Sequence, residues 1–105
     1  MTAAEFIQSL PQKANPEALA GHNTCFQFEI AGEGGGDFTV NIVEGKLSVE
    51  NGLHGTPNCS VKTKAETLVK VVKGEENAAS AVMFGKIKIS NLGEMMKYAK
   101  VFGLM

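Results

Sequence analysis

The sequence predicts an α+β fold, in which a five-stranded, mixed but mostly antiparallel sheet carries about five helices on one face. Five short segments alternate apolar and polar residues, which is typical of strands with one buried face. Other segments space their apolar residues as helices do, and a sheet that is apolar on one side needs one covering layer. Because 105 residues supply one hydrophobic core, we expect a single domain over residues 1–105.

Two short helices are expected first. Thr2 and Glu5 have the spacing of a capping box, and apolar residues follow at positions 6, 7 and 10. This helix should end by Pro11, because proline disfavours helical backbone at the preceding residue. Asn15 and Pro16 then have the residue types of an N-cap and a first helical position.

The expected strands follow from period-two alternation at residues 25–30, 38–42, 47–49, 59–63 and 86–90. The first three should form an antiparallel meander, with the glycine-rich stretch at 31–37 as a hairpin loop. A strand stands on both sides of that loop, so it is not a dinucleotide-binding motif. If the fourth and fifth strands pair, the helical crossover between them predicts a parallel pair.

Three helices are expected in the second half, each with a polar start and a glycine stop. Thr63 and Glu66 are spaced as a capping box for the first, which Gly74 ends. The second runs from about residue 77 to 84. Asn91 caps the third, with Glu94 at its third position, and the glycine at 103 closes it.

Methionine is frequent in this region, at Met83, Met95 and Met96. The last two belong to a stripe at helical spacing. Methionine is unbranched and polarisable, so a wall built from it adapts to irregular shapes. Such a wall suits an apolar ligand of variable shape, such as a lipid chain. On spacing alone, however, the pattern favours an ordinary core.

Few residues favour catalysis or a metal site. His22 and His54 are the only histidines and lack metal-ligand spacing, so we expect no catalytic residue, metal or cofactor, and no enzyme activity. Cys25 and Cys59 form no CxxC pair, which fits free thiols in a reducing compartment. No secretory signal or membrane-spanning run is visible, which favours the cytoplasm.

Charge is divided unevenly along the chain. Residues 1–60 carry seven acidic side chains and two lysines, and residues 61–105 carry eight lysines and four glutamates. This asymmetry can orient the protein toward an anionic surface, although an ordinary solvated surface has the same composition. All cations are lysines. The absence of arginine, with few aromatic residues in the basic half, argues against nucleic acid as a partner.

The second half resembles the sterol carrier protein type 2 family, also called non-specific lipid-transfer proteins. The resemblance rests on residues 58–63, 68–74 and 78–90, and above all on a small-residue helix leading into the GKIKI run at 85–89. The resemblance continues through the NLGxMMK helix start at residues 91–97. Similarity is strong from about residue 58 and consistent only in pattern before that.

The resemblance implies an apolar tunnel, between the sheet and the helices, that takes a fatty acid, fatty acyl-CoA, sterol or phospholipid. We expect its lining to include Leu68, Val71, Val72, Val82, Met83, Phe84, Ile87, Leu92, Met95, Met96, Ala99 and Phe102. Four lysines are candidates for steering a headgroup or an anionic membrane: Lys86, Lys88, Lys97 and Lys100. The apolar end at 102–105 is expected to pack over the tunnel mouth.

The sequence departs from the family in three places. Phe84 stands where the family often has a glutamine, which puts headgroup recognition by that side chain in doubt. The loop at Asn91 is one residue short, and the peroxisomal tail of the animal members is missing, which suggests a bacterial-type or otherwise cytosolic stand-alone member. The alternative function is a non-catalytic accessory or scaffold domain with a lipid- or isoprenoid-metabolising enzyme as its partner.

An empty tunnel would lower the stability of the folded protein. A void costs on the order of 24 cal/mol per Å³, so about 300 Å³ would cost roughly 7 kcal/mol. A whole domain is stable by only about 5–15 kcal/mol. The space must therefore be filled, collapsed or hydrated when no lipid is bound, and we expect the helix from Leu92 to shift in order to close it.

Overall fold

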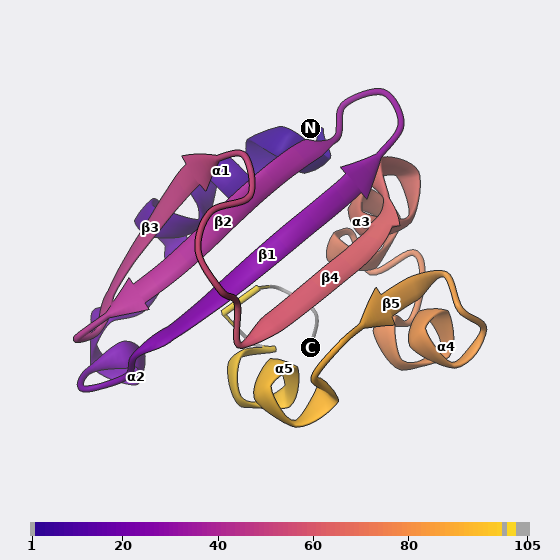
Figure 1. Ribbon diagram of the computed structural model, residues 1–105. Helices are drawn as coiled ribbons and strands as arrows, with labels where there is room; N and C mark the ends of the chain where they lie inside the picture. Colours follow the sequence, from indigo (N-terminus) through magenta and orange to yellow (C-terminus); the bar gives the residue numbers. More distant parts are fainter. Residues whose placement is uncertain (1, 100, 103–105) are drawn as a thin grey trace.

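A five-stranded sheet forms the front layer of the molecule, with the strands in the order β3-β2-β1-β4-β5 and with helices behind it (Figure 1). The computed structural model describes residues 2–99 and 101–102. The elements are α1 (Ala3–Lys13), α2 (Pro16–Leu19), β1 (Thr24–Ala31), β2 (Gly36–Val43), β3 (Lys46–Asn51), β4 (Cys59–Lys64), α3 (Ala65–Val72), α4 (Ala78–Met83), β5 (Ile87–Ile89) and α5 (Leu92–Tyr98).

The strand directions confirm a mixed sheet and correct one predicted pairing. β1 is antiparallel to β2, where Phe26 pairs with Val40, and parallel to β4, where Phe26 pairs with Cys59. β5 pairs with β4, but antiparallel, so the expectation of a parallel pair was wrong. Two helices, α3 and α4, connect β4 to β5. The expectation assumed one reversal of the chain, but the second helix adds another, so β5 runs opposite to β4.

The first helix begins as predicted and ends later. Thr2 and Glu5 form both hydrogen bonds of the capping box. The helix then continues through Pro11 to Lys13, so the expected end at Pro11 was wrong. Proline removes one backbone donor, but the Ala14 amide still bonds the Leu10 carbonyl at 2.9 Å. The buried apolar face of α1 holds its last turn against the core.

The predicted capping box at the start of α3 is absent. Thr63 lies in β4, where its hydroxyl donates to the Lys86 carbonyl at 3.0 Å. Lys64 occupies the N-cap position and makes no side-chain cap. The sequence pattern predicted that the Thr63 hydroxyl caps α3. Instead it bonds to Lys86, the residue before β5.

The glycine-rich stretch forms the predicted hairpin loop between β1 and β2. Gly35 shows why glycine is needed there, because a Cβ on this residue would lie 2.3 Å from the Ile30 carbonyl oxygen. Gly36 then pairs with Ile30 to begin β2.

The core lies between the sheet and the helices. It is formed by the inward-facing residues of the strands together with apolar faces of α1, α3 and α5. On the other side of the sheet, the chain from β3 to β4 crosses in front of the strands (Figure 1). None of the described helices has the length and hydropathy needed to cross a bilayer.

Candidate functional site

An apolar groove of about 450 Å³ lies at the β5 edge of the molecule, bounded by α4, β5 and α5. Every lining residue is apolar: Ala78, Ala79, Val82, Met83, Ile87, Ile89, Leu92, Met95, Met96 and Ala99. Its volume falls within the range of about 300–1,000 Å³ that is typical of small-molecule sites.

Local sequence signals build the α4 and β5 walls. The Asn77 side chain caps α4 by accepting a hydrogen bond from the Ser80 amide at 3.0 Å. Two of the alanines that follow, Ala78 and Ala79, are short and leave room beside the helix. Gly85 has a φ of +76°, a left-handed conformation that glycine adopts without strain, and it turns the chain into β5.

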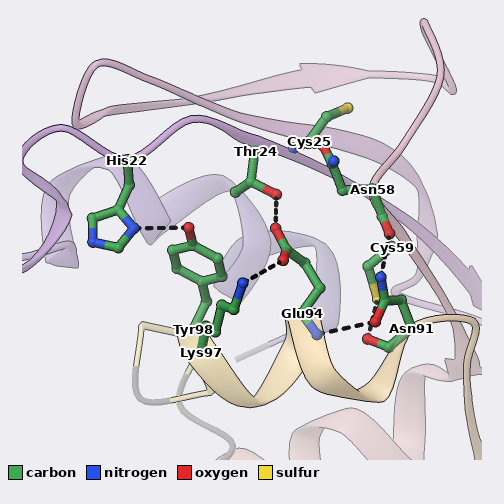
Figure 2. Close-up of polar contacts among 9 residues, drawn as sticks. All are labelled: His22, Thr24, Cys25, Asn58, Cys59, Asn91, Glu94, Lys97 and Tyr98. Carbon is green, nitrogen blue, oxygen red and sulfur yellow. Dashed lines mark hydrogen bonds and ion pairs between the residues drawn. The ribbon is translucent and has the colours of Figure 1, made fainter.

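Polar contacts hold the first turn of α5 against the sheet (Figure 2). Asn91 caps the helix by accepting from the Glu94 amide at 3.1 Å. Its side-chain amide also donates to the Asn58 carbonyl at 3.3 Å, and the Cys59 thiol lies 3.4 Å from its backbone oxygen. The cap is thus tied to the beginning of β4.

Two further polar pairs connect α5 to the start of β1 (Figure 2). Thr24 donates to the Glu94 carboxylate at 2.6 Å, and this hydrogen bond, more than the nearby Lys97, holds the pKa of Glu94 below its usual value. The Tyr98 hydroxyl lies 2.9 Å from His22 Nδ1, and burial raises the pKa of Tyr98. None of these polar residues lines the groove, so they position its wall and leave its surface apolar.

The groove is open to solvent along one side. Met83 is 80% exposed, Met96 is 60% exposed and Leu92 is 50% exposed, whereas Met95 and Ala99 are buried at its floor. Exposed apolar side chains of this size are costly to hydrate. A ligand lying in the groove would remove them from water.

The structure brings seven of the twelve sequence-predicted lining residues to this groove: Val82, Met83, Ile87, Leu92, Met95, Met96 and Ala99. Whether they contact a lipid stays a prediction. Sequence reasoning missed Ala78, Ala79 and Ile89. The first two precede Val82 and Met83 by four residues, and Ile89 follows Ile87 by two, so helical and strand periodicity contained the signal.

The other five predicted lining residues lie elsewhere. Leu68 and Val71 are buried in the core on α3, and Val72 packs against that core. Phe84 is 75% exposed and lies outside the groove. Phe102 is buried under the sheet, with its ring 4.9 Å from that of Phe26 and 5.3 Å from that of Phe28.

Phe102 packs in the region where the family resemblance implied a tunnel between the two layers. Under β1, the central strand, that space is filled by the aromatic side chains of Phe26, Phe28 and Phe102. The apolar groove lies beside these rings, at the β5 edge. Filling the interior avoids the free-energy cost of a void.

The predicted steering lysines have different environments. Lys86 pairs with Glu76 at 2.6 Å, and Lys97 pairs with Glu94 at 3.4 Å. Lys88 is exposed on the face of β5 opposite to the groove-lining Ile87 and Ile89. Lys100 and residues 103–105, which were expected to pack over the mouth, lie outside the described residues.

The cysteines are free thiols, and burial raises the pKa of both Cys25 and Cys59. A raised thiol pKa lowers the fraction of reactive thiolate. Among residues 2–99 and 101–102, no group of three His, Cys, Asp or Glu side chains is placed to hold a metal ion.

Comparison with known proteins gives one family and a recurring fold. A model described as the SCP-2 sterol transfer family matches residues 4–105. Hydroxysteroid dehydrogenase-like protein 2 of Xenopus tropicalis is 26% identical in an alignment of 103 positions that covers 96% of this chain. The chain spans only a quarter of that protein's length.

Two solved structures share the fold. The palmitated SCP2L2 of Aedes aegypti superposes with a TM-score of 0.73 at 21% identity, over 97% of this chain and 95% of that one. The sec-alkylsulfatase Pisa1 of Pseudomonas sp. gives a TM-score of 0.78 at 20% identity, over 100% of this chain and 16% of the sulfatase. The same fold therefore occurs both alone and as part of a much longer enzyme chain.

Proposed function

This chain belongs to the SCP-2 sterol transfer family, a family with a lipid-binding fold, and from that premise we propose that it binds and transfers lipids in the groove between α4, β5 and α5. The ligand is a fatty acid, fatty acyl-CoA, sterol or phospholipid. Residues 1–105 act as one domain that contributes no chemistry of its own. We place it in the cytoplasm, where thiols such as Cys25 and Cys59 stay reduced.

One observation carries the proposal: the groove is of ligand size and all ten of its lining residues are apolar. Such a surface recognises a hydrocarbon through the area that it removes from water. It offers no side-chain hydrogen bond to a headgroup, so the polar end of the ligand lies outside. We therefore expect selection by the size of the apolar part and broad tolerance of headgroups.

Ala79 offers a direct test, because it lines the groove and is exposed at its wall. Ala79→Phe places a ring in the groove, and we expect the affinity of delipidated protein for a fluorescent fatty acid to fall about tenfold or more, the equivalent of about 1.4 kcal/mol. The matched control is Ser80→Phe, the next residue of α4, which is exposed and outside the groove. This control should bind as the unmodified chain does.

A thermal-shift experiment gives a second readout. A ligand at 100 times its dissociation constant adds about 2.7 kcal/mol of stability, so acyl ligands should raise the melting temperature. The proposal fails if delipidated protein shows neither saturable fatty-acid binding nor such a shift.

The second candidate is a non-catalytic accessory or scaffold domain for lipid- or isoprenoid-metabolising enzymes. It is favoured by relatives in which the matching region is a small part of a longer protein, namely 25% of the frog protein and 16% of the sulfatase. Native mass spectrometry of gently purified protein separates the two candidates. Co-purifying lipid supports the carrier, and a bare mass with a tight protein partner supports the scaffold.

A further inference from the structure

The strand β3 forms one edge of the sheet and has a neighbouring strand on one side only. It is the last strand in the order β3-β2-β1-β4-β5 and lies at the outer left of the sheet, at the opposite end from the groove (Figure 1). It has six residues, whereas the other edge strand, β5, has three. The edge of a sheet presents backbone N–H and C=O groups that can pair with another strand.

The pairing of β3 with β2 shows which backbone groups face outward. The two strands are antiparallel, and the Gly52 amide donates to the Asp37 carbonyl at 2.8 Å. In an antiparallel pair, alternate residues direct both of their backbone groups toward the neighbouring strand. The even-numbered residues of β3 therefore bond to β2, and Leu47 and Val49 direct their N–H and C=O groups away from it.

Backbone groups on both sides of Leu47 and Val49 already have partners. The Gly45 amide donates to the His22 carbonyl at 3.1 Å. The Asn51 carbonyl oxygen lies 2.8 Å from the His54 ring. The free edge of β3 is therefore short and centred on the residue between Leu47 and Val49.

The side chains of β3 are complementary to those of a second β3. Lys46, Ser48 and Glu50 are exposed, whereas the alternate residues Leu47 and Val49 pack partly against the core. Neither Lys46 nor Glu50 forms an ion pair with another described residue. Antiparallel pairing of two copies about Ser48 places each Lys46 directly opposite the partner's Glu50, and opposite charges in that position stabilise a strand pair.

The backbone and the charges select the same register. Pairing about Ser48 sets Leu47 opposite the partner's Val49, so the outward groups of the two copies exchange four hydrogen bonds. With the axis moved to Leu47, Glu50 would lie opposite the partner's Glu44, and like charges in that position are destabilising. With the axis moved to Val49, both ion pairs are lost.

We propose that two copies of this chain dimerise by antiparallel pairing of β3 with β3, about a twofold axis at Ser48. The two five-stranded sheets then become one continuous sheet. The grooves lie at its two ends, because each belongs to a β5 edge. This interface goes beyond the proposed carrier function and does not depend on it. A standard interface has about 20–30 residues a side, so a pair of short strands should give a weak dimer that forms at high protein concentration.

Charge reversal tests the pairing, with sedimentation velocity of the full chain at increasing concentration as the measurement. Lys46→Glu makes both ion pairs of the dimer into pairs of glutamates, and Glu50→Lys makes both into pairs of lysines. Each variant alone should therefore dimerise about tenfold or more weakly than the unmodified chain. An equimolar mixture of the two should dimerise as the unmodified chain does, because lysine again lies opposite glutamate.

The double variant Lys46→Glu with Glu50→Lys is the matched control, because it keeps the net charge and exchanges the two partners. It should also dimerise as the unmodified chain does. An unmodified chain that is still monomeric at about 1 mM overturns the proposal. So does a mixture, or a double variant, that dimerises no better than the single variants.

A disulfide reports the register. Residues opposite each other at a non-hydrogen-bonded position have Cα atoms about 4.5 Å apart, which a disulfide can bridge. Ser48→Cys should therefore form a covalent dimer with oxidised glutathione. The matched control is Val43→Cys on β2, at an exposed position that three strand spacings, about 14 Å or more, would separate from its counterpart.

The unmodified chain is the background for this experiment, because it already carries the free thiols Cys25 and Cys59. Both it and Val43→Cys should stay uncrosslinked. Covalent dimerisation of Ser48→Cys that is no faster than that of Val43→Cys overturns the axis at Ser48 and the proposal with it.

Discussion

The ring of Phe102 lies edge-on against the ring of Phe26, with 4.9 Å between their centroids, beneath the central strand of the sheet. Phe102 is 1% exposed and comes from the turn after α5. The chain thus fills the middle of its own interior with a side chain from the segment that also walls the groove. The apolar groove lies beside this packed region, at the β5 edge.

Phe102→Ala should therefore lower the free energy of unfolding by about 3–5 kcal/mol, the usual cost of removing a fully buried phenylalanine ring. Urea denaturation measures it. The control is Val101→Ala, since Val101 is only partly buried and its loss should cost clearly less. An apolar void under the sheet also accepts apolar molecules, so a fatty acid should stabilise Phe102→Ala more than it stabilises the unmodified chain. Equal costs for the two variants would show that Phe102 is not a packed core residue.

A second prediction concerns pH and the bond between Thr24 and Glu94. This 2.6 Å hydrogen bond lowers the pKa of Glu94 in the folded protein. A carboxyl with a depressed folded pKa stabilises fully above its unfolded pKa, about 4.3 for glutamate, and loses that contribution as the pH falls through the folded value. Glu94→Gln should thus cost about 1–2 kcal/mol at neutral pH, and the difference should shrink below about pH 4.

Chemical denaturation across this pH range measures the effect. Thr24→Val keeps the size of the buried side chain but removes the hydroxyl, so it should flatten the same part of the stability profile. If Glu94→Gln and the unmodified chain lose stability in parallel as the pH falls, the hydrogen bond does not set the acid sensitivity.

Local signals predicted most of the fold. Asn15 and Asn91 were assigned as helix caps from residue type and position, and each side chain accepts the expected backbone hydrogen bond. Period-two alternation located the five strands, because successive side chains of a strand point alternately into the core and away from it. These features depend on neighbours within a few residues, which the sequence displays directly.

Features that depend on distant partners were harder to predict. Thr63 had two possible roles, and its bond to Lys86 in the neighbouring strand decided between them. Likewise, Met95, Ala99 and Phe102 share helical spacing, but Phe102 entered the interior under β1 while the other two line the groove. Spacing shows which residues share a face. It does not show that one face borders two different spaces.

The caps of the two groove helices give a third prediction. Asn77→Ala removes one hydrogen bond, to the Ser80 amide, and should cost about 0.5–2 kcal/mol. Asn91→Ala should cost more, because its side chain both caps α5 and donates to the Asn58 carbonyl. Urea denaturation and amide hydrogen exchange in α5 measure the two. Equal costs would mean that the contact with Asn58 does not anchor α5.

The last prediction concerns how the affinity of the groove depends on the length of the ligand's hydrocarbon chain. With an all-apolar lining, each added methylene group should contribute up to about 0.8 kcal/mol, or about fourfold in affinity, until the chain fills the groove. Saturated fatty acids of increasing length, titrated against a bound fluorescent fatty acid, report this dependence. A fatty acid and its methyl ester of equal length should displace the probe almost equally, because the headgroup lies outside.

In Ala79→Phe the affinity should level off at a shorter chain, since the new ring occupies part of the groove. An affinity that ignores chain length, or that falls steeply on esterification, would show that a polar site outside the groove governs recognition.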